Sequence, residues 1–320
     1  MTVVYFDQTQ VTVREDESVL DSLLNHKIDV PFGCKNGVCQ SCMLQASDGA
    51  IPQQAQKGLT EMQTKQGYFL ACQCHPTETL YISSDPIEQP STIGQVIEKE
   101  WVSPNVIRLR VRADLDFKPG QFINLKNPDG VIRSYSIASL PHDGILEFHI
   151  KHIAGGRFSD WVKHALNVGD SIELQGPLGE CYLKADDEST PLVLAAMNTG
   201  LAPVLGILKN ALAQQHQGAI RVFIGAKDLA GHYLVDEIND LVKPHDHVQV
   251  YRVCLEQASQ QQNIQQADIY HLIKSEVANT KGHQVYLCGA ESFVKKLKKQ
   301  CFLAGANMGD IFADAFVAAG

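Results

Sequence analysis

The stretch CKNGVCQSC, residues 34–42, places three cysteines within nine residues. Three thiolates on one short loop are one ligand short of a four-coordinate metal site. The next cysteines along the chain are Cys72 and Cys74, in the segment Phe69-Leu-Ala-Cys-Gln-Cys-His-Pro76. We therefore expect the loop and one of these two cysteines to form a metal centre in the first part of the chain.

The spacing of the cysteines favours a cluster of two irons. With Cys72 as the fourth ligand the pattern is C-x4-C-x2-C-x29-C, which is typical of a plant-type 2Fe–2S cluster. A loop that wraps such a cluster must turn its N–H groups toward the sulfurs, and Gly33 and Gly37 allow the positive φ that this requires. A zinc site is the alternative, but zinc sites usually take ligands from two C-x2-C knuckles and this segment has one. Cys74 stays open as a rival fourth ligand.

The composition is that of a soluble globular protein with more than one domain. The chain has 320 residues, 44% of them hydrophobic and 20% charged, and this length allows two or three domains. Its start, MTVVYFDQ, has no basic region before an apolar stretch, so we expect no signal peptide. Nine cysteines without an export signal indicate a reducing compartment, and we predict a cytoplasmic protein without membrane insertion.

Acidic residues are concentrated at the start of the chain. The net charge of −9 argues against nucleic acid as a partner, because no basic stripe is available to neutralise phosphates. Residues 1–92 hold eleven Asp or Glu against five Lys or Arg and so supply −6 of this charge. Such a surface is either simply solvated or a docking face for a basic partner protein, and both interpretations stay open.

Three segments differ in hydrophobic pattern. Residues 1–90 start with the alternation of a β-hairpin and continue with a helix that Ser18 is expected to cap. Residues 95–188 are a succession of short strand patterns separated by turns, which predicts a small antiparallel barrel. Residues 189–320 alternate apolar strands with amphipathic helices, which is typical of a parallel nucleotide-binding sheet. A polar stretch with prolines, residues 86–94, is predicted to link the first two segments.

Three short patterns are suited to phosphate-bearing cofactors. Arg133-Ser-Tyr-Ser136 follows a strand pattern, although four residues alone favour an ordinary half-buried strand. Gly155-Gly-Arg-Phe-Ser159 opens a helical pattern, and glycines at a helix N-terminus with a nearby serine form a natural phosphate cradle. Met197-Asn-Thr-Gly200 follows a buried strand and precedes a helix, which directs N–H groups and a positive helix end at a pyrophosphate.

Together with Lys118-Pro-Gly-Gln-Phe122 and Gly176-Pro-Leu-Gly179, these patterns resemble the ferredoxin–NADP⁺ reductase superfamily. The order of segments is similar to that of the reductase components of bacterial oxygenases, such as those serving benzoate dioxygenase and methane monooxygenase. The resemblance implies a multi-domain α+β and α/β fold. It consists of a β-grasp ferredoxin domain over residues 1–90, an antiparallel β-barrel FAD-binding domain over 95–188, and a Rossmann-like NAD(P)H-binding domain over 189–320.

The resemblance also implies ligands for the cluster and the flavin. The ferredoxin pattern Leu-x-Cys-x-x-x-Pro selects Cys72 over Cys74, so the implied metal ligands are Cys34, Cys39, Cys42 and Cys72. Arg133 is implied to pair with the pyrophosphate, Tyr135 to lie against the isoalloxazine and Ser136 to approach its N5 edge. The further implied flavin contacts are His149, Ile150, Lys151, Gly156, Arg157 and Ser159.

For the nicotinamide nucleotide, Thr199 and Gly200 match the superfamily turn Gly-Gly-Thr-Gly-x-x-Pro, with Met197 and Asn198 in place of its first two glycines. Asparagine tolerates positive φ, so the turn can survive, but the departure puts dinucleotide affinity in question. Tyr286-Leu-Cys-Gly-Ala290 resembles a Cys-Gly-Pro motif in which the cysteine, here Cys288 before Gly289, lies near the nicotinamide. Phe316 resembles the C-terminal aromatic that shields the flavin. The implied catalytic residues are Tyr135, Ser136, Cys288 and Phe316.

The predicted function is an NADH-dependent flavin and iron–sulfur reductase. A flavin takes hydride from nicotinamide and can give electrons singly to a cluster, so it belongs between them. The predicted partner is an oxygenase component that docks on the acidic ferredoxin domain. NADH is favoured over NADPH because Gly225-Ala-Lys-Asp228 lacks a Ser/Arg pair for a 2′-phosphate, although Lys227 keeps NADPH open.

Two other functions remain as hypotheses. In the first, the chain is an electron carrier or adaptor whose altered Met197-Asn198 turn has lost the dinucleotide. In the second, the reductase serves a client other than an oxygenase, such as a deoxysugar dehydratase.

Overall fold

Contacts between residues divide the chain into two compact units. The first comprises Met1–Ser91 with Asn124–Ser134, and the second comprises Thr92–Ile123 with Tyr135–Ala318. The computed structural model describes residues 1–33, 35–83, 91–185, 187–256, 258–259 and 263–316. Cys34, a predicted metal ligand, therefore lies outside the described residues, as does most of the predicted linker.

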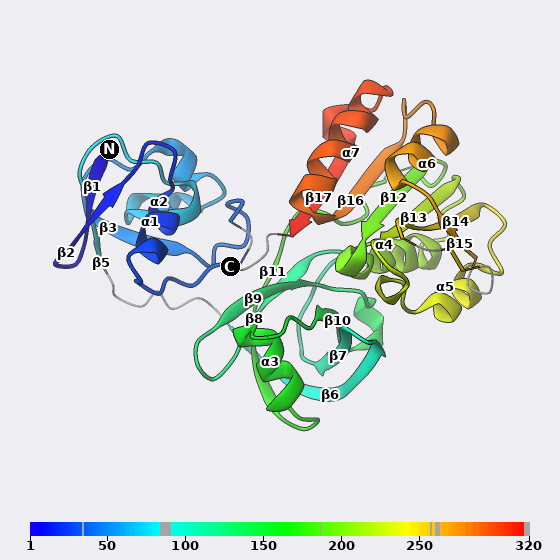
Figure 1. Ribbon diagram of the computed structural model, residues 1–320, viewed down its shortest axis with the longest axis horizontal. Helices are drawn as coiled ribbons and strands as arrows, with labels where there is room; N and C mark the ends of the chain where they lie inside the picture. The colour runs from blue at the N-terminus through cyan, green and yellow to red at the C-terminus, as the bar shows by residue number, and fades with distance from the viewer. Residues whose placement is uncertain (34, 84–90, 186, 257, 260–262, 317–320) are drawn as a thin grey trace. The chain divides into compact units, whose positions relative to one another are not determined.

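The first unit contains a mixed five-stranded sheet in the order β2-β1-β5-β3-β4 (Figure 1). The two N-terminal strands form the predicted antiparallel hairpin, and β5 joins β1 in parallel. The elements are β1 (Thr2–Phe6), β2 (Thr9–Val13), α1 (Val19–Asn25), β3 (Met43–Asp48), α2 (Glu61–Lys65), β4 (Tyr68–Leu70) and β5 (Leu80–Ser83).

Helix α1 begins where the sequence predicts, because Ser18 caps it. The Ser18 hydroxyl accepts a hydrogen bond from the Asp21 N–H at 3.1 Å, which satisfies one free donor of the first turn. Leu20 and Leu23 are fully buried. The same hydrophobic core contains Cys42, Cys72 and Cys74, so the cysteines are positioned by the packing of this unit.

A six-stranded sheet follows in the order β10-β7-β6-β11-β8-β9. An antiparallel bridge between Ile137, directly after β9, and Phe148 on β10 joins the two ends of this order, which closes the sheet into the predicted barrel. The elements are β6 (Thr92–Ser103), β7 (Val106–Arg112), β8 (Phe122–Lys126), β9 (Ile132–Ser136), β10 (Leu146–Lys151), α3 (Arg157–His164) and β11 (Ser171–Leu178).

The end of the predicted linker is wrong, because β6 begins at Thr92. Gly94, the last residue of the predicted linker, has a packing role. A Cβ built on it would lie 2.4 Å from Val111 Cγ1 and 3.0 Å from Leu174 Cδ1. Glycine at this position therefore permits the close approach of neighbouring strands.

The nucleotide-binding sheet is parallel in all its described pairs and has the order β15-β14-β13-β12-β16-β17 (Figure 1). Alternate residues of β12 enter two separate cores: Leu194 packs with helices α4 and α5, and Val193 packs with α6 and α7. Burial on both faces explains the continuous apolar run in the sequence. The elements are β12 (Leu192–Met197), α4 (Leu201–Ala213), β13 (Ile220–Ala226), α5 (Val235–Val242), β14 (Val248–Cys254), β15 (Ile264–Gln266), α6 (Ile269–Glu276), β16 (Gln284–Ala290), α7 (Glu291–Leu303) and β17 (Ile311–Phe316).

Among the described residues, no helix has the length and apolar character needed to cross a membrane.

Candidate cofactor and nucleotide sites

The structure brings together the three described cysteines of the predicted cluster. Cys39, Cys42 and Cys72 are all buried. A hydrogen bond between the Cys42 and Cys72 thiols raises the pKa of Cys42 and lowers that of Cys72, and both pKa values also respond to Cys39. The amide of Gln73 contacts Cys72 Sγ at 3.7 Å. These sulfurs thus share one small volume at the end of the loop.

The loop backbone turns as a cluster-wrapping loop requires, but not at every predicted residue. Gly37 has φ +76°, and its N–H donates to Cys72, as expected. Gln40 has φ +55°, a value that glycine adopts more easily. Gly33 was expected to need positive φ and does not. The absence of a side chain at Gly33 instead leaves space for the Cys39 sulfur, since a Cβ on Gly33 would lie 3.2 Å from Cys39 Sγ.

Contact with another predicted ligand separates the two rival fourth ligands. Cys72 shares a hydrogen bond with Cys42, and this bond lowers the pKa of Cys72. Cys74 has no exposed surface, and burial alone raises the pKa of its thiol to about 12. The contact with Cys42 therefore favours Cys72 as the fourth ligand.

The described cysteines can supply part of the ligand set of a cluster of two irons. Four thiolates shared by two irons leave two for each. The hydrogen-bonded pair of Cys42 and Cys72 offers two of these thiolates from one place in the fold. In the part of the chain that the structure describes, no three His, Cys, Asp or Glu side chains converge on one metal position.

The predicted flavin residues Arg133, Tyr135 and Ser136 lie on β9, the last strand in the order of the barrel sheet. Arg133 donates to the Ile132 carbonyl at 2.7 Å. Tyr135 packs against Phe158 with ring centroids 5.5 Å apart. Ser136 is buried, and its hydroxyl donates to Asp314 Oδ2 at 2.7 Å. Asp314 comes from β17, so this hydrogen bond joins the barrel to the nucleotide-binding sheet.

Burial raises the pKa of Asp314 to about 6, although its hydrogen bond from Ser136 opposes the shift. At pH values between the ordinary pKa of an aspartate and about 6, the Asp314 carboxyl therefore keeps its proton in the folded chain and has lost it in the unfolded chain. Stability falls as pH rises through this window, because the folded state binds more protons.

We expect the melting temperature of Asp314→Asn, relative to that of the parent, to rise by a few degrees (~2–4 °C) between pH 4 and pH 7. Asp246→Asn, at an exposed position, is the control, and parallel melting curves for parent and Asp314→Asn would contradict the prediction.

On β10 the predicted flavin contacts differ in exposure. Ile150 is fully buried, and the His149 side chain also has no exposed surface. Their role along the ribityl path stays a prediction. Lys151 is exposed and lines a cavity beside the nucleotide turn.

The predicted phosphate cradle at α3 is partly filled by the protein itself. Gly156 is the N-cap residue, and Arg157, the first residue of the helix, is exposed. The Ser159 hydroxyl is engaged with the N–H and carbonyl of Ile153, each at 3.1 Å. Asp160 accepts from the Gly155 N–H at 2.8 Å, as acidic side chains at a helix N-terminus do. A phosphate at this position therefore has to compete with a carboxylate.

The nucleotide turn after β12 has the geometry that the sequence predicts. Asn198 has φ +53°, in the left-handed region that asparagine tolerates. Gly200 packs directly on β16: a Cβ there would lie 2.1 Å from the Cys288 carbonyl oxygen. Gly289 has φ +147°, and a Cβ on it would lie 2.9 Å from Met197 Cβ. The turn and the Cys288-Gly289 motif therefore fit together through two glycines.

Cys288 is fully buried and has a second cysteine beside it. Its Sγ lies 3.7 Å from that of Cys181, which follows β11, and burial raises the pKa of Cys288. The Asp314 N–H also interacts with Cys288. Phe316, the predicted shielding aromatic, is half-buried opposite Ala290 at the end of β17. Ser136, Asp314 and Cys288 thus form one contiguous group.

A cavity of about 180 Å³ opens at the carboxyl ends of β12 and β13. This edge of a parallel sheet is where such folds bind nucleotides. Two lysines contribute positive charge, and Asp228 accepts from the Gly231 N–H at 3.2 Å. The cavity is lined by Asn105, Val106, Lys151, Asn198, Thr199, Lys227, Asp228, Gly231 and Tyr233.

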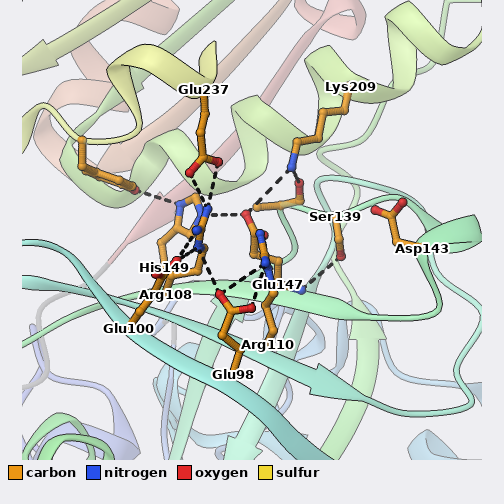
Figure 2. A network of polar contacts seen from close by, with 12 residues as sticks. Glu98, Glu100, Arg108, Arg110, Ser139, Asp143, Glu147, His149, Lys209 and Glu237 are labelled. Atoms are coloured by element: carbon orange, nitrogen blue, oxygen red, sulfur yellow. Dashed lines mark hydrogen bonds and ion pairs between the residues drawn. The ribbon is translucent and has the colours of Figure 1, made fainter. Parts of the chain in front are cut away.

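Ion pairs between buried barrel side chains and more exposed helix side chains join the barrel to the helices beside this cavity (Figure 2). Arg108 on β7 donates to both carboxylate oxygens of Glu237 on α5 at 2.8 Å. Arg110 donates to Glu147 at 2.8 Å, and Lys209 on α4 lies 3.8 Å from the same carboxylate. The paired charges compensate one another's burial, so the two sheets of this unit are joined by specific contacts.

Sequence reasoning missed Asp314, Cys181 and Tyr233. An acidic residue inside the apolar strand pattern Ile311–Phe316 was a visible signal for Asp314. The partners of the other two are distant in sequence: Cys181 meets Cys288 across 107 residues, and Tyr233 meets His149 across 84. The sequence around Cys181 and Tyr233 has no pattern that indicates these distant partners.

Three family models match the chain in succession. They describe a 2Fe-2S iron-sulfur cluster binding domain over residues 4–77, an oxidoreductase FAD-binding domain over 93–182 and an oxidoreductase NAD-binding domain over 195–299. The ferredoxin–NAD(P)⁺ reductase component of a naphthalene 1,2-dioxygenase system from Pseudomonas putida is 30% identical over 95% of this chain and 94% of that protein. Reductase component 1 of terephthalate 1,2-dioxygenase from Comamonas sp is 28% identical over 94% of this chain and 92% of that protein.

Solved structures share the fold along the whole chain. The Amycolatopsis cytochrome P450 reductase GcoB gives a TM-score of 0.70 at 24% identity and covers 99% of both chains. The ferredoxin reductase in carbazole 1,9a-dioxygenase gives 0.67 at 23% identity, over 99% of this chain and 98% of that one. The three-part arrangement predicted from the cysteines, the barrel and the parallel sheet is confirmed.

Proposed function

Because this chain belongs to the ferredoxin–NAD(P)⁺ reductase components of oxygenase systems, we propose that it carries electrons from NADH to a terminal oxygenase protein. When bound, FAD accepts electrons in pairs from NADH and releases them one at a time to the cluster. The observation that carries the proposal is the presence, in one chain, of a cysteine loop, a barrel and a nucleotide turn. We propose domain limits of 1–90, 95–188 and 189–320 and a cytoplasmic location.

In this function the chain's own residues bind the cluster and the flavin, shield the flavin and orient the side chains around it. Cys34, Cys39, Cys42 and Cys72 hold the cluster, and the N–H of Gly37 stabilises a thiolate at Cys72. Arg133, Tyr135 and Ser136 hold the flavin. Asp314 fixes the Ser136 hydroxyl, while Phe316 shields the same region until the nicotinamide enters.

The nucleotide turn favours a reductase over a carrier that has lost the dinucleotide. Asn198 has φ +53°, a value that glycine also adopts readily, so the substitution is compatible with a tight turn. Asp228, after β13, supports NADH, since an acidic residue there binds ribose hydroxyls and repels a 2′-phosphate. Cytochrome c reduction assayed with NADH, with NADPH and with neither tests this: we expect activity with NADH well above that with NADPH. An absence of activity with both nucleotides would support the carrier.

The acidic surface of the first unit is proposed as the docking face. This unit combines exposed carboxylates with a cysteine loop in which Val38, beside Cys39, is 45% exposed. The negative charge attracts a basic partner protein. The exposed Val38, beside the predicted ligand Cys39, gives this partner an apolar contact close to the cluster. The exposed acidic residues are Asp7, Glu15, Asp16, Asp29, Asp48, Glu61 and Glu78.

Salt is expected to weaken this docking. Raising the ionic strength from about 0.05 M to about 0.5 M should lower kcat/KM for a basic protein acceptor roughly tenfold, because exposed charges are screened. NADH-driven reduction of ferricyanide, a small anion, is the control and should not fall with added salt. An acceptor rate independent of salt would contradict electrostatic docking.

A further inference from the structure

His149 is buried between a carboxylate and a phenol rather than at an open face of the barrel. His149 Nε2 lies 3.2 Å from Glu147 Oε1, and Nδ1 lies 2.9 Å from the hydroxyl oxygen of Tyr233. The His149 and Tyr233 rings meet edge to face, with centroids 5.2 Å apart. All three side chains are buried, and Figure 2 shows Glu147 and His149 within the ion-pair network.

The direction of each hydrogen bond follows from the protonation states. Although burial raises it, the pKa of Glu147 is held well below its usual range by His149 and by the charges of Lys209 and Arg110. A carboxylate only accepts, so His149 Nε2 carries the proton and donates to Glu147. Burial lowers the pKa of His149, so its Nδ1 keeps a lone pair, and burial raises the pKa of Tyr233. Tyr233 therefore donates to His149 Nδ1.

Tyr233 also belongs to the wall of the cavity at the nucleotide turn. The same wall contains Thr199 of the turn and Lys227 and Asp228 after β13. Tyr233 comes just before α5, whose Glu237 is paired with Arg108 of the barrel. The segment that carries the Tyr233 ring thus contacts the barrel twice, through Tyr233 with His149 and through Glu237 with Arg108. Of these side chains from the segment, Tyr233 is the one that lines the cavity.

We propose that His149 is a positioning residue for the nicotinamide dinucleotide: it accepts the hydrogen bond of Tyr233 and so fixes that ring in the wall of the cavity. The inference rests on the proposed function, because it takes the dinucleotide as the ligand of this cavity. A ring held in place before binding spares the ligand the cost of ordering it. His149 then affects nucleotide affinity without touching either the nucleotide or the flavin.

Tyr233→Phe tests the bond with the smallest change, because it removes one oxygen atom and keeps the ring. We expect the dissociation constant for NAD⁺, measured by isothermal titration calorimetry, to rise about five- to tenfold. KM for NADH should rise with it, while kcat and the FAD content per chain stay within about twofold. Tyr251→Phe is the control, since that hydroxyl bonds Glu276 on an exposed surface outside the cavity.

Variants of His149 separate positioning from simple packing. His149→Leu fills a similar volume without accepting the bond and should weaken NAD⁺ binding as Tyr233→Phe does. His149→Gln can donate to Glu147 and accept from Tyr233, so it should restore affinity to within about twofold. The double variant Tyr233→Phe/His149→Leu should bind no more weakly than either single variant, because both remove the same bond.

Each outcome bears on a different claim. Unchanged NAD⁺ affinity in Tyr233→Phe, or fully additive losses in the double variant, would overturn the positioning role while leaving the proposed function intact. A parent protein that binds no NAD⁺ at all would instead contradict the proposed function. Equal losses in His149→Gln and His149→Leu would show that the site requires imidazole for packing and would also overturn the inference.

Discussion

Replacing Cys72 by alanine is expected to remove the cluster and with it the delivery of electrons to a protein acceptor. Cys72 is the buried cysteine that pairs with Cys42, and its surroundings favour the thiolate. NADH-driven reduction of cytochrome c should fall at least about 100-fold, because the one-electron outlet is lost. Reduction of ferricyanide, which can take electrons from the flavin, should stay within about twofold. Iron and acid-labile sulfide per chain should fall in parallel with the cytochrome c activity.

Cys74→Ala is the matched control two residues away. Its thiol has no exposed surface and a pKa raised to about 12, so it serves as a small apolar side chain in the core. We expect this variant to keep its iron and its cytochrome c activity and to lose about 1 kcal/mol of stability. A variant set in which Cys74→Ala loses iron while Cys72→Ala retains it would reverse the assignment of the fourth ligand.

Gly200→Ala is expected to disable the nucleotide site. The added Cβ would lie 2.1 Å from the Cys288 carbonyl oxygen and 2.9 Å from the Gly289 nitrogen. Both are backbone atoms of β16 and cannot move aside as a flexible side chain can, so the turn must shift. Since the turn directs its N–H groups at the pyrophosphate, KM for NADH should rise about tenfold or more. Steady-state rates of ferricyanide reduction at several NADH concentrations give this constant.

Gly309→Ala is the control for this substitution. A Cβ added at Gly309 would have no atom within 4 Å, and the residue has no positive φ, so alanine should be accepted there without effect. FAD and iron contents of both variants establish that the other sites are intact. An unchanged KM in Gly200→Ala, with the cofactors in place, would contradict the role of the turn.

Much of the fold follows from local patterns in the sequence. The hairpin, the cap at Ser18 and the strands of the barrel and parallel sheet were predictable because period-two and helical patterns reflect burial on one or two faces. The cysteine spacing was equally informative, since ligands on one loop are close in sequence. The linker was predicted to extend to Gly94 because a glycine that permits close packing has the same local signature as one in a linker.

The parts that sequence reasoning missed depend on long-range contacts. Ser136 meets Asp314 across 178 residues, and Arg108 meets Glu237 across 129. Which face of β10 carries His149 was visible from alternation, but what lies opposite that face was not. The residues that join the barrel to the nucleotide-binding sheet therefore emerge only from the folded chain.

The central claim is that one chain carries electrons from NADH through FAD to its own cluster. Anaerobic titration of the purified protein with NADH, followed in the visible spectrum, tests it most directly. We expect the flavin and the iron–sulfur absorbance to bleach together, and the reduced cluster to give an electron paramagnetic resonance signal. A bleached flavin beside a cluster that stays oxidised would contradict the proposed path of electrons.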